Sequence, residues 1–146
     1  MRKLLKLFGI GPRLAWAFVA GVVVRTARRI AGKPPRIWHG FSPMFSIPGL
    51  VAADRRAGFP SRSVVRHVRL RDYQLVREVD FDTVYEGDGT SSDAAHWLCL
   101  ADLLRHGDIW WAHFEDHFFR WDQRRMNARV MRVIRAAGIR ILVAPH

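Results

Sequence analysis

The sequence predicts an α/β fold: an open parallel sheet with helices on both faces, preceded by a basic and apolar helix. Two observations predict it. Short runs of apolar and β-branched residues alternate with helix-length segments, which is typical of β-α-β units with parallel strands. In addition, a hydrophobic fraction of 49% in a chain of 146 residues suits one compact domain with a continuous core.

The first segment, residues 1–35, is set apart by its charge. Residues 1–53 contain nine Lys and Arg and no acidic residue, whereas residues 54–146 hold 15 basic and 13 acidic residues. The formal net charge of +11 therefore belongs mainly to the N-terminal part of the chain. Because a nucleic-acid binder more often carries basic residues across its folded part, we expect no nucleic-acid partner.

An apolar run inside this segment is flanked by cations. The run Leu14–Val24 has 11 residues, whereas a membrane-spanning helix needs about 20. Three interpretations stay open: a helix packed on its own domain, a helix that lies on an anionic membrane surface through residues 1–33, and a signal or anchor. Gly32 is expected to end the helix. We expect a cytoplasmic location, with peripheral contact to the inner face of the plasma membrane as one option.

Residues 36–146 are expected to form one domain. Four segments have the composition of strands: 36–39, 61–68, 108–114 and 139–146. Three segments have the composition of helices: 46–58, 91–107 and 121–138.

The ends of these helices support the assignment. Ser46 is placed to cap the first helix, and Ser91 or Ser92 to cap the second, because their hydroxyl oxygens can accept from free backbone N–H groups. Glycines are expected to end all three helices, at positions 58, 107 and 138. Residues 69–89 are mixed in composition and leave open a short strand and a loop.

Three of the predicted strands end in a histidine: His39, His113 and His146. The carboxyl ends of parallel strands meet at one edge of a sheet, where ligands bind near the switch in strand order. We therefore expect the three side chains to project toward one edge. Gly40 would allow close backbone approach there, and Ser42 lies on the following loop. A histidine at a strand end can also bond a loop carbonyl only, so a structural role stays open for each.

Other chemistries have weaker signals. His113 and His117 are four residues apart with Glu115 between them, but the stretch follows a strand and is not an H-E-x-x-H helix, so we expect no metal. Cys99 lies in an apolar run and is expected to be a buried hydrophobic residue. The chain has neither a G-x-S-x-G nor a G-x-G-x-x-G motif, which disfavours a hydrolase and a dinucleotide cofactor. We expect no cofactor.

Three stretches together resemble a known family. They are "RIWHGFSPMFSIPGLVAADRRAGF", "RDYQLVREVDFDTVY" and "DIWWAHFEDHFFRWDQRRMNARVMRVIRAAGIRILVAPH". Over residues 36–146 the chain resembles the N-terminal half of a GT-B glycosyltransferase of the family 4-like kind. Members of that family have two Rossmann-like domains facing across a cleft, the first receiving the acceptor and the second binding the nucleotide-sugar.

The resemblance implies a Rossmann-like domain on the acceptor side of a glycosyltransferase, one that transfers a sugar from a nucleotide-sugar to a cell-envelope acceptor. The donor-binding domain is expected to be absent, so the chain would be truncated and inactive alone. The nucleotide-sugar donor would be a partner only if a C-terminal domain is supplied. The alternative is a non-catalytic Rossmann-like interaction domain that works with a partner chain. The residues expected to bind substrate are His39, Gly40, Ser42, His113, Glu115 and His146.

Overall fold

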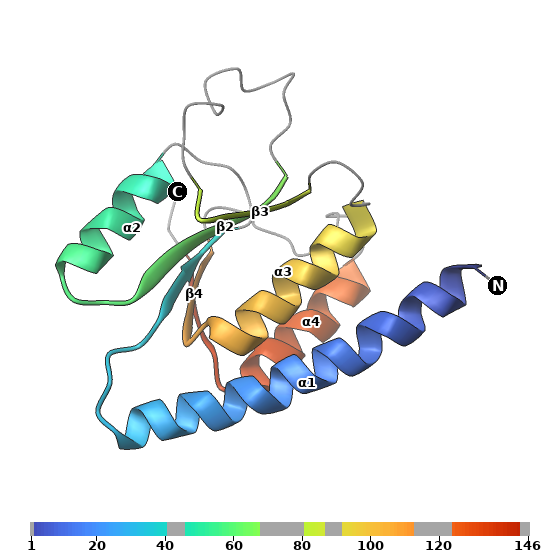
Figure 1. The fold of residues 1–146 in the computed structure, drawn as a ribbon, viewed down its shortest axis with the longest axis horizontal. Helices are drawn as coiled ribbons and strands as arrows, with labels where there is room; N and C mark the ends of the chain where they lie inside the picture. Colours follow the sequence, from blue (N-terminus) through green and yellow to red (C-terminus); the bar gives the residue numbers. More distant parts are fainter. Residues whose placement is uncertain (1, 41–45, 68–80, 87–91, 113–123, 144–146) are drawn as a thin grey trace.

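The computed structural model describes residues 2–40, 46–67, 81–86, 92–112 and 124–143. Within these residues, five strands form one sheet in the order β3-β2-β1-β4-β5, and every neighbouring pair is parallel (Figure 1). The predicted open parallel sheet is confirmed. The strands are β1 (Ile37–His39), β2 (Ser61–His67), β3 (Thr83–Glu86), β4 (Ile109–Ala112) and β5 (Arg140–Val143).

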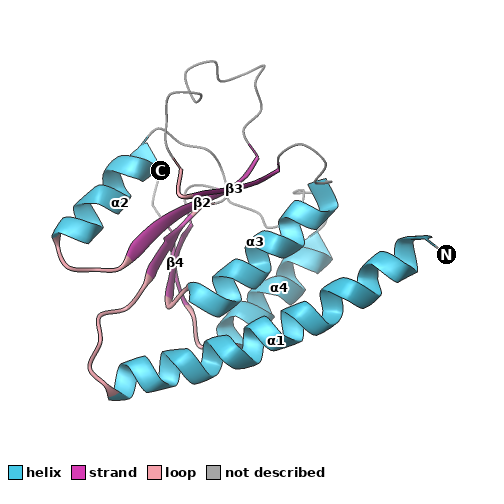
Figure 2. Cartoon of the chain, in the orientation of Figure 1, coloured by secondary structure: helices cyan, strands magenta, loops and turns pink. Residues whose placement is uncertain are grey.

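Helices cover both faces of this sheet, as predicted. The helices are α1 (Arg2–Ile30), α2 (Ser46–Arg56), α3 (Ser92–His106) and α4 (Arg124–Ala136). Helix α2 covers one face, whereas α1, α3 and α4 lie on the other (Figure 2). The strand order explains this division. From β1 the chain passes through α2 to β2, and later it moves in the opposite direction along the sheet through α3 to β4 and through α4 to β5. Because the crossovers are right-handed, α2 lies on one face and α3 and α4 on the other.

The end of α1 is set by Gly32, as the sequence predicts. Gly32 has a positive φ of 62°, a backbone conformation that costs glycine nothing. Its N–H donates to the carbonyl of Arg29 over 3.1 Å, and the N–H of Lys33 donates to the carbonyl of Arg28 over 3.0 Å. These two bonds form a Schellman motif, which satisfies helix carbonyls that would otherwise lack donors.

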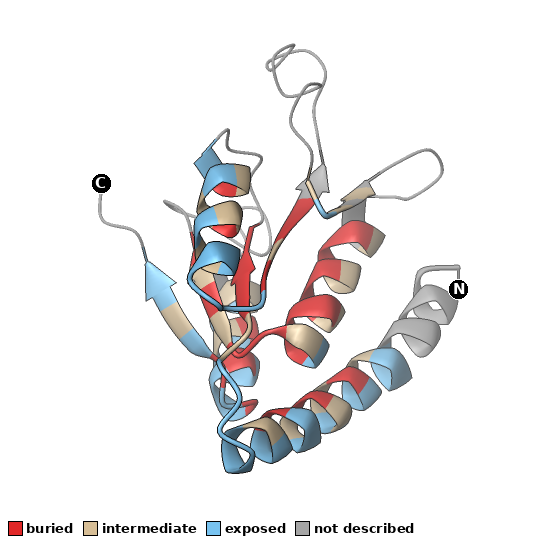
Figure 3. Cartoon of the chain, turned by 60° about the vertical axis from the view of Figure 1, so that its left-hand side comes forward, coloured by how far each residue is buried: buried red, intermediate tan, exposed pale blue. Residues whose placement is uncertain are grey.

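The core lies between the sheet and the layer of α1, α3 and α4 (Figure 3). Trp38 of β1 and Trp110 of β4 are direct neighbours in the register, and both are fully buried on this side. Buried indole N–H groups need acceptors. The Trp38 indole donates to the carboxylate of Asp102 on α3 over 2.6 Å, and the Trp110 indole donates to the carbonyl of Gly40 over 3.0 Å.

Helix α1 is packed on its own domain over the part whose side chains are described. Ala17, Gly21 and Arg25 form its buried face and lie against α3. A Cβ atom added at Gly21 would lie only 1.9 Å from the carbonyl oxygen of Leu104, so the two helices touch backbone to backbone there. Among the described residues, no helix has the length and apolarity needed to cross a bilayer.

Candidate functional site at the carboxyl edge of the sheet

The strand order reverses between β1 and β4. The chain leaves β1 through α2 toward β2, whereas β4 pairs with the opposite side of β1 and leads to β5. In open α/β sheets such a switch point opens a crevice at the carboxyl ends of the strands. The three histidines were predicted to lie at the ends of strands β1, β4 and β5. These strands are neighbours and parallel, so their carboxyl ends share this edge. His113 and His146 themselves lie outside the described residues, as do Ser42 and Glu115.

His39 is the last residue of β1, and its side chain is completely buried. Its Nε2 atom lies 2.7 Å from Oδ2 of Asp54 on α2, and its ring stacks on Trp111 of β4 with the ring centroids 5.3 Å apart. The imidazole is thus held between the sheet and α2. Direct contact between this ring and a substrate stays a prediction, whereas its role in fastening α2 to the sheet follows from these contacts.

Asp54 accepts a second hydrogen bond on the same oxygen. The hydroxyl of Ser61, at the start of β2, donates to Oδ2 of Asp54 over 2.9 Å. A Ser-His-Asp nucleophile needs the hydroxyl bonded to the imidazole, with the carboxylate on the far side of the ring. Here Ser61 and His39 both bond the carboxylate, so this group is a buried polar anchor and lacks the geometry of an activated serine.

Gly40 is used for close backbone approach, but its neighbour is the adjacent strand. A Cβ atom at this position would lie 1.8 Å from the carbonyl oxygen of Val64 in β2, and its φ of 153° is one that residues with side chains rarely adopt. Its own carbonyl accepts the Trp110 indole N–H. The glycine therefore lets β1 end tightly against its neighbours at the edge of the sheet.

A second polar anchor joins the end of α2 to β2 and β3. The Arg55 guanidinium donates to both carboxylate oxygens of Asp82 over 2.9 Å, and Asp82 also accepts from the backbone N–H of Ser63 over 2.7 Å. Partial burial opposes ionisation of Asp82, but the hydrogen bonds from Ser63 and Arg55 outweigh it and lower the pKa of this carboxyl. The role of Asp54 and Asp82 was not evident from the sequence, because their partners come from other elements.

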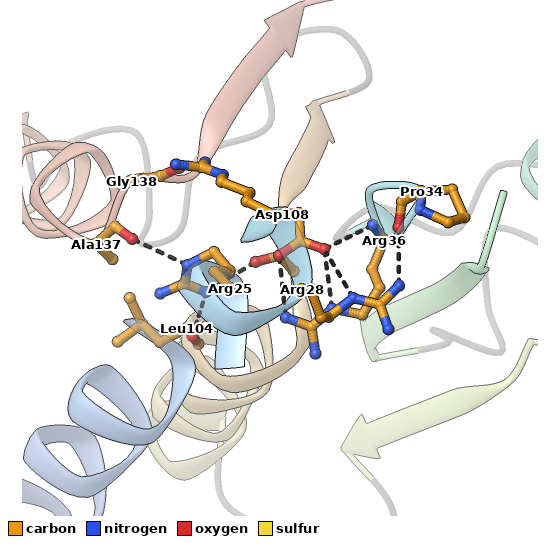
Figure 4. A network of polar contacts seen from close by, with 10 residues as sticks. Arg25, Arg28, Pro34, Arg36, Leu104, Asp108, Ala137 and Gly138 are labelled. Atoms are coloured by element: carbon orange, nitrogen blue, oxygen red, sulfur yellow. Dashed lines mark hydrogen bonds and ion pairs between the residues drawn. The ribbon is translucent and has the colours of Figure 1, made fainter. Parts of the chain in front are cut away.

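The amino edge of the sheet holds a cluster that sequence reasoning missed (Figure 4). The buried Arg25 donates through Nε to the carbonyl of Ala137 over 3.0 Å and through Nη1 to those of Leu104 and Gly107 over 2.7 and 2.8 Å. It thereby satisfies carbonyls at the C-terminal ends of α3 and α4. The spacing of Arg25, Arg28 and Arg29 in the sequence was the available signal, but it indicates only a charged end of a helix.

Metal and thiol chemistry gain no support from the described residues. No group of three or more His, Cys, Asp or Glu side chains in this part of the chain lies close enough together to hold a metal ion. His117 lies outside the described residues. Cys99 belongs to α3 and is completely buried in the core, in agreement with the expectation of a buried hydrophobic residue.

Comparison with known proteins yields no match, either to a family model, to a curated protein or to a solved structure.

Proposed function

We propose that this chain is the acceptor-side domain of a glycosyltransferase that transfers a sugar from a nucleotide-sugar to a cell-envelope acceptor. The observation that carries the proposal is the adjacency of β1, β4 and β5, whose carboxyl ends meet at the strand-order switch. A crevice at that switch is where an α/β sheet of this kind binds its ligand. The resemblance of residues 36–146 to the acceptor domain of the GT-B family points to the same edge.

The residues predicted to bind substrate are proposed to have different roles. His113, Glu115 and His146 contact the acceptor, because imidazole and carboxylate groups can bond sugar hydroxyls as donors or acceptors. His39 is a positioning residue, since its ring is buried against Asp54 and Trp111 and supports the ends of β1 and β4. Sugar transfer depends on orientation and on charge stabilisation at the leaving phosphate, and the latter belongs to the donor-binding domain.

Calorimetry and NMR test this proposal. Titration of the isolated chain with uridine, guanosine and adenosine diphosphate sugars is expected to give no binding tighter than about millimolar. In ¹⁵N-labelled protein, glycolipid acceptors in mixed micelles are expected to shift histidine side-chain signals, and the variants His113→Ala and His146→Ala are expected to weaken that binding. The control is His106→Ala, because His106 ends α3 and lies beside the amino edge. Equal weakening by the control, or micromolar binding of a nucleotide-sugar, would overturn the proposal.

The proposal includes peripheral contact with an anionic membrane through α1. Its buried face is formed by Ala17, Gly21 and Arg25, whereas Trp16 and Val23 on the opposite side are 65% and 61% exposed. Side chains at this spacing lie on one face of a helix. Cations precede and follow the apolar stripe in the sequence, and no acidic residue occurs before Asp54. Such a face favours the interface of an anionic bilayer.

The second candidate function is a non-catalytic interaction domain with a partner chain. It is favoured by the edge strand β5, where Leu142 is 46% exposed and Val143 is 64% exposed. Within the sheet that the structure describes, β5 is an edge strand, and the backbone groups of such a strand can pair with a strand from another chain while exposed apolar side chains add contact area. The test is copurification of a partner with the wild-type chain and its loss from the Leu142→Lys and Val143→Lys variants. If this is observed and no glycolipid shifts the histidine signals, the second function replaces the first.

A further inference from the structure

A cavity of about 210 Å³ lies at the amino edge of the sheet, beside the C-terminal turn of α1. This edge is opposite to the proposed acceptor edge, because the cavity is lined by residues that precede β1 and β4 and by the first residue of β5. Five cationic side chains and one carboxylate line it: Arg25, Arg28, Arg29, Lys33, Arg140 and Asp108. The lining therefore carries a large excess of positive charge.

The single carboxylate of the lining is already compensated. Asp108 accepts from the backbone N–H of Arg36 over 2.7 Å and from the guanidinium of Arg36 over 3.0 Å at each of its two oxygens. Arg36 does not line this cavity. Burial opposes ionisation of Asp108, but these hydrogen bonds and the charges of Arg36 and Arg28 outweigh it and lower the pKa of the carboxyl. Asp108 thus stays ionised and is bound mainly to Arg36. Its negative charge therefore offsets only a small part of the positive charge that lines the cavity.

The two inner cations of the cavity, Arg25 and Arg28, each keep a buried N–H group that no described residue accepts. Arg25 is 2% exposed, and its guanidinium donates to backbone carbonyls, which carry no full charge (Figure 4). Its Nη2 atom and the Nε atom of Arg28 are buried and have no hydrogen-bond partner among the described residues. Nη2 of Arg25 lies at the contact with α3, 3.0 Å from where a Cβ atom of Gly21 would be, and Nε of Arg28 lies 3.8 Å from Oδ2 of Asp108, too far for a hydrogen bond. A buried cationic donor without an acceptor is costly, so an anion in the cavity that accepts from Arg28 would be stabilising.

The outer cations are available to a ligand. Lys33 and Arg140 are exposed, and their side chains form no hydrogen bond or ion pair with any described residue. Arg29 donates to the carbonyl of Gly138 over 2.8 Å through one nitrogen and keeps further N–H groups. Together the inner and outer cations surround a space large enough for a small anion.

We propose that this cavity binds a phosphate group, either as inorganic phosphate or as the head-group phosphate of a phospholipid. Guanidinium groups bond phosphate oxygens in a two-pronged geometry, and several cations suit a group that can carry two negative charges. A carboxylate ligand would leave more of the positive charge uncompensated. The proposal is independent of the proposed sugar transfer, since the two sites lie at opposite edges of the sheet.

The test uses the full chain and inorganic phosphate, titrated by calorimetry at low ionic strength with sulfate-free buffer. The variant Lys33→Gln with Arg140→Gln removes two cations of the cavity and breaks no hydrogen bond among the described residues. Its control, Arg56→Gln with Arg129→Gln, removes two exposed cations of α2 and α4 that do not line the cavity. The first pair is expected to weaken phosphate binding about tenfold or more, and the control pair by less than about twofold.

A second arm identifies the source of the phosphate. Flotation compares phosphatidylcholine vesicles containing phosphatidic acid with vesicles of equal charge containing phosphatidylserine. If the phosphate is a lipid head group, the wild-type chain prefers phosphatidic acid and the first pair of substitutions removes this preference. If the ligand is free phosphate, calorimetric binding persists without a lipid preference.

The proposal would be overturned if the wild-type chain neither binds phosphate in calorimetry nor prefers vesicles with phosphatidic acid. It would also be overturned if the two variant pairs weaken phosphate binding equally. Thermal unfolding of both variants beforehand establishes that they are folded. A glycolipid titration of the Lys33→Gln and Arg140→Gln variant separates the two proposals, because acceptor binding at the carboxyl edge is expected to be unchanged.

Discussion

At the scale of single residues, burial decides what a histidine can do. His39 occupies the strand end that the fold offers to a ligand, yet its ring is completely buried and bonded to Asp54. His106 ends α3 near the opposite edge and is only partly buried. The same side chain thus has two different surroundings, one inside the fold and one partly open to solvent.

His106 is expected to make the stability of the protein depend on pH near neutrality. Burial lowers the pKa of His106, and the nearby charge of Arg62 lowers it further, against the opposing charge of Asp102. The unfolded chain then binds more protons than the folded chain below the ordinary histidine pKa of about 6.5. Stability is therefore fully present above that pH and falls as the pH drops through it.

Urea unfolding of His106→Gln between pH 7.5 and 5.5 measures this effect. The substitution is expected to flatten the decline in the free energy of unfolding, whereas the control Arg56→Gln, an exposed residue of α2, is expected to retain it. An equally steep decline in both variants would assign the pH dependence to other groups.

At the scale of elements, α1 has two faces with different uses. One face packs on α3 through Ala17, Gly21 and the buried Arg25, and the two backbones touch at Gly21. The other face exposes apolar side chains at helical spacing, with Val19 next to Trp16 and Val23. The helix is thus an integral part of the domain and at the same time the carrier of the proposed membrane contact.

Gly21→Ala is expected to destabilise the protein. The new methyl group would lie 1.9 Å from the carbonyl oxygen of Leu104, so the helices must separate, and such overpacking costs about 1–3 kcal/mol. Gly11→Ala is the matched control in the same helix, because a Cβ atom there has no neighbour within 4 Å among the described residues. Since alanine favours helix over glycine, the control is expected to gain up to about 1 kcal/mol. Urea unfolding distinguishes the two, and equal effects would refute close packing at Gly21.

The exposed stripe of α1 is expected to govern vesicle binding. The variant Trp16→Ser with Val19→Ser and Val23→Ser should lose most binding to vesicles rich in phosphatidylglycerol, because it removes the apolar area that enters the interface. Binding of the wild-type chain should weaken as salt is added, since charges near the surface are screened. Val133→Ser removes an exposed apolar side chain of α4 and serves as the control. Equal binding to neutral and anionic vesicles at all salt concentrations would contradict the electrostatic part.

At the scale of the whole molecule, Asp108 joins segments that are far apart in the sequence. It precedes β4, accepts from Arg36 before β1, and lies 3.8 Å from Nε of Arg28 in α1. Its carbonyl also accepts from the N–H of Arg140 at the start of β5. Asp108 therefore links the amino edge of the sheet to α1, in addition to the hydrogen bonds of Arg25 and Arg29.

Asp108→Asn is expected to destabilise the protein by about 1–3 kcal/mol at pH 7, because Arg36 and Arg28 lose their negative partner. The pKa of Asp108 is lowered in the folded state, so its contribution is present at neutral pH and is lost as the pH falls below about 4. The variant should thus differ from the wild type at pH 7 and approach it at pH 3. Urea midpoints across this range provide the measurement, and a constant difference at all pH values would refute the ionic contribution.

The layered fold follows from the alternation of strand and helix segments along the sequence. Local signals are sufficient for this, because β-branched runs, serine caps and terminal glycines such as Gly32 act within a few residues of the chain. The order of the strands could be predicted from the sequence only in part. The sequence predicts parallel pairing but does not show which strand lies beside β1. Once β4 and β5 are placed there, the expected meeting of three strand ends follows.

What the tertiary structure alone decided concerns side chains whose partners are distant in the sequence. The charge pattern of residues 1–53 predicted a basic N-terminal segment, but not that Arg25 would be buried beneath α3 and α4 or that its neighbours would form a cationic cavity. Likewise, the sequence placed His39 at the edge of the sheet, whereas its bond to Asp54 depends on how α2 lies across β1. The physical reason is the same in both cases: a polar side chain is buried only where folding supplies its partners, and those partners lie 15 to 112 residues away.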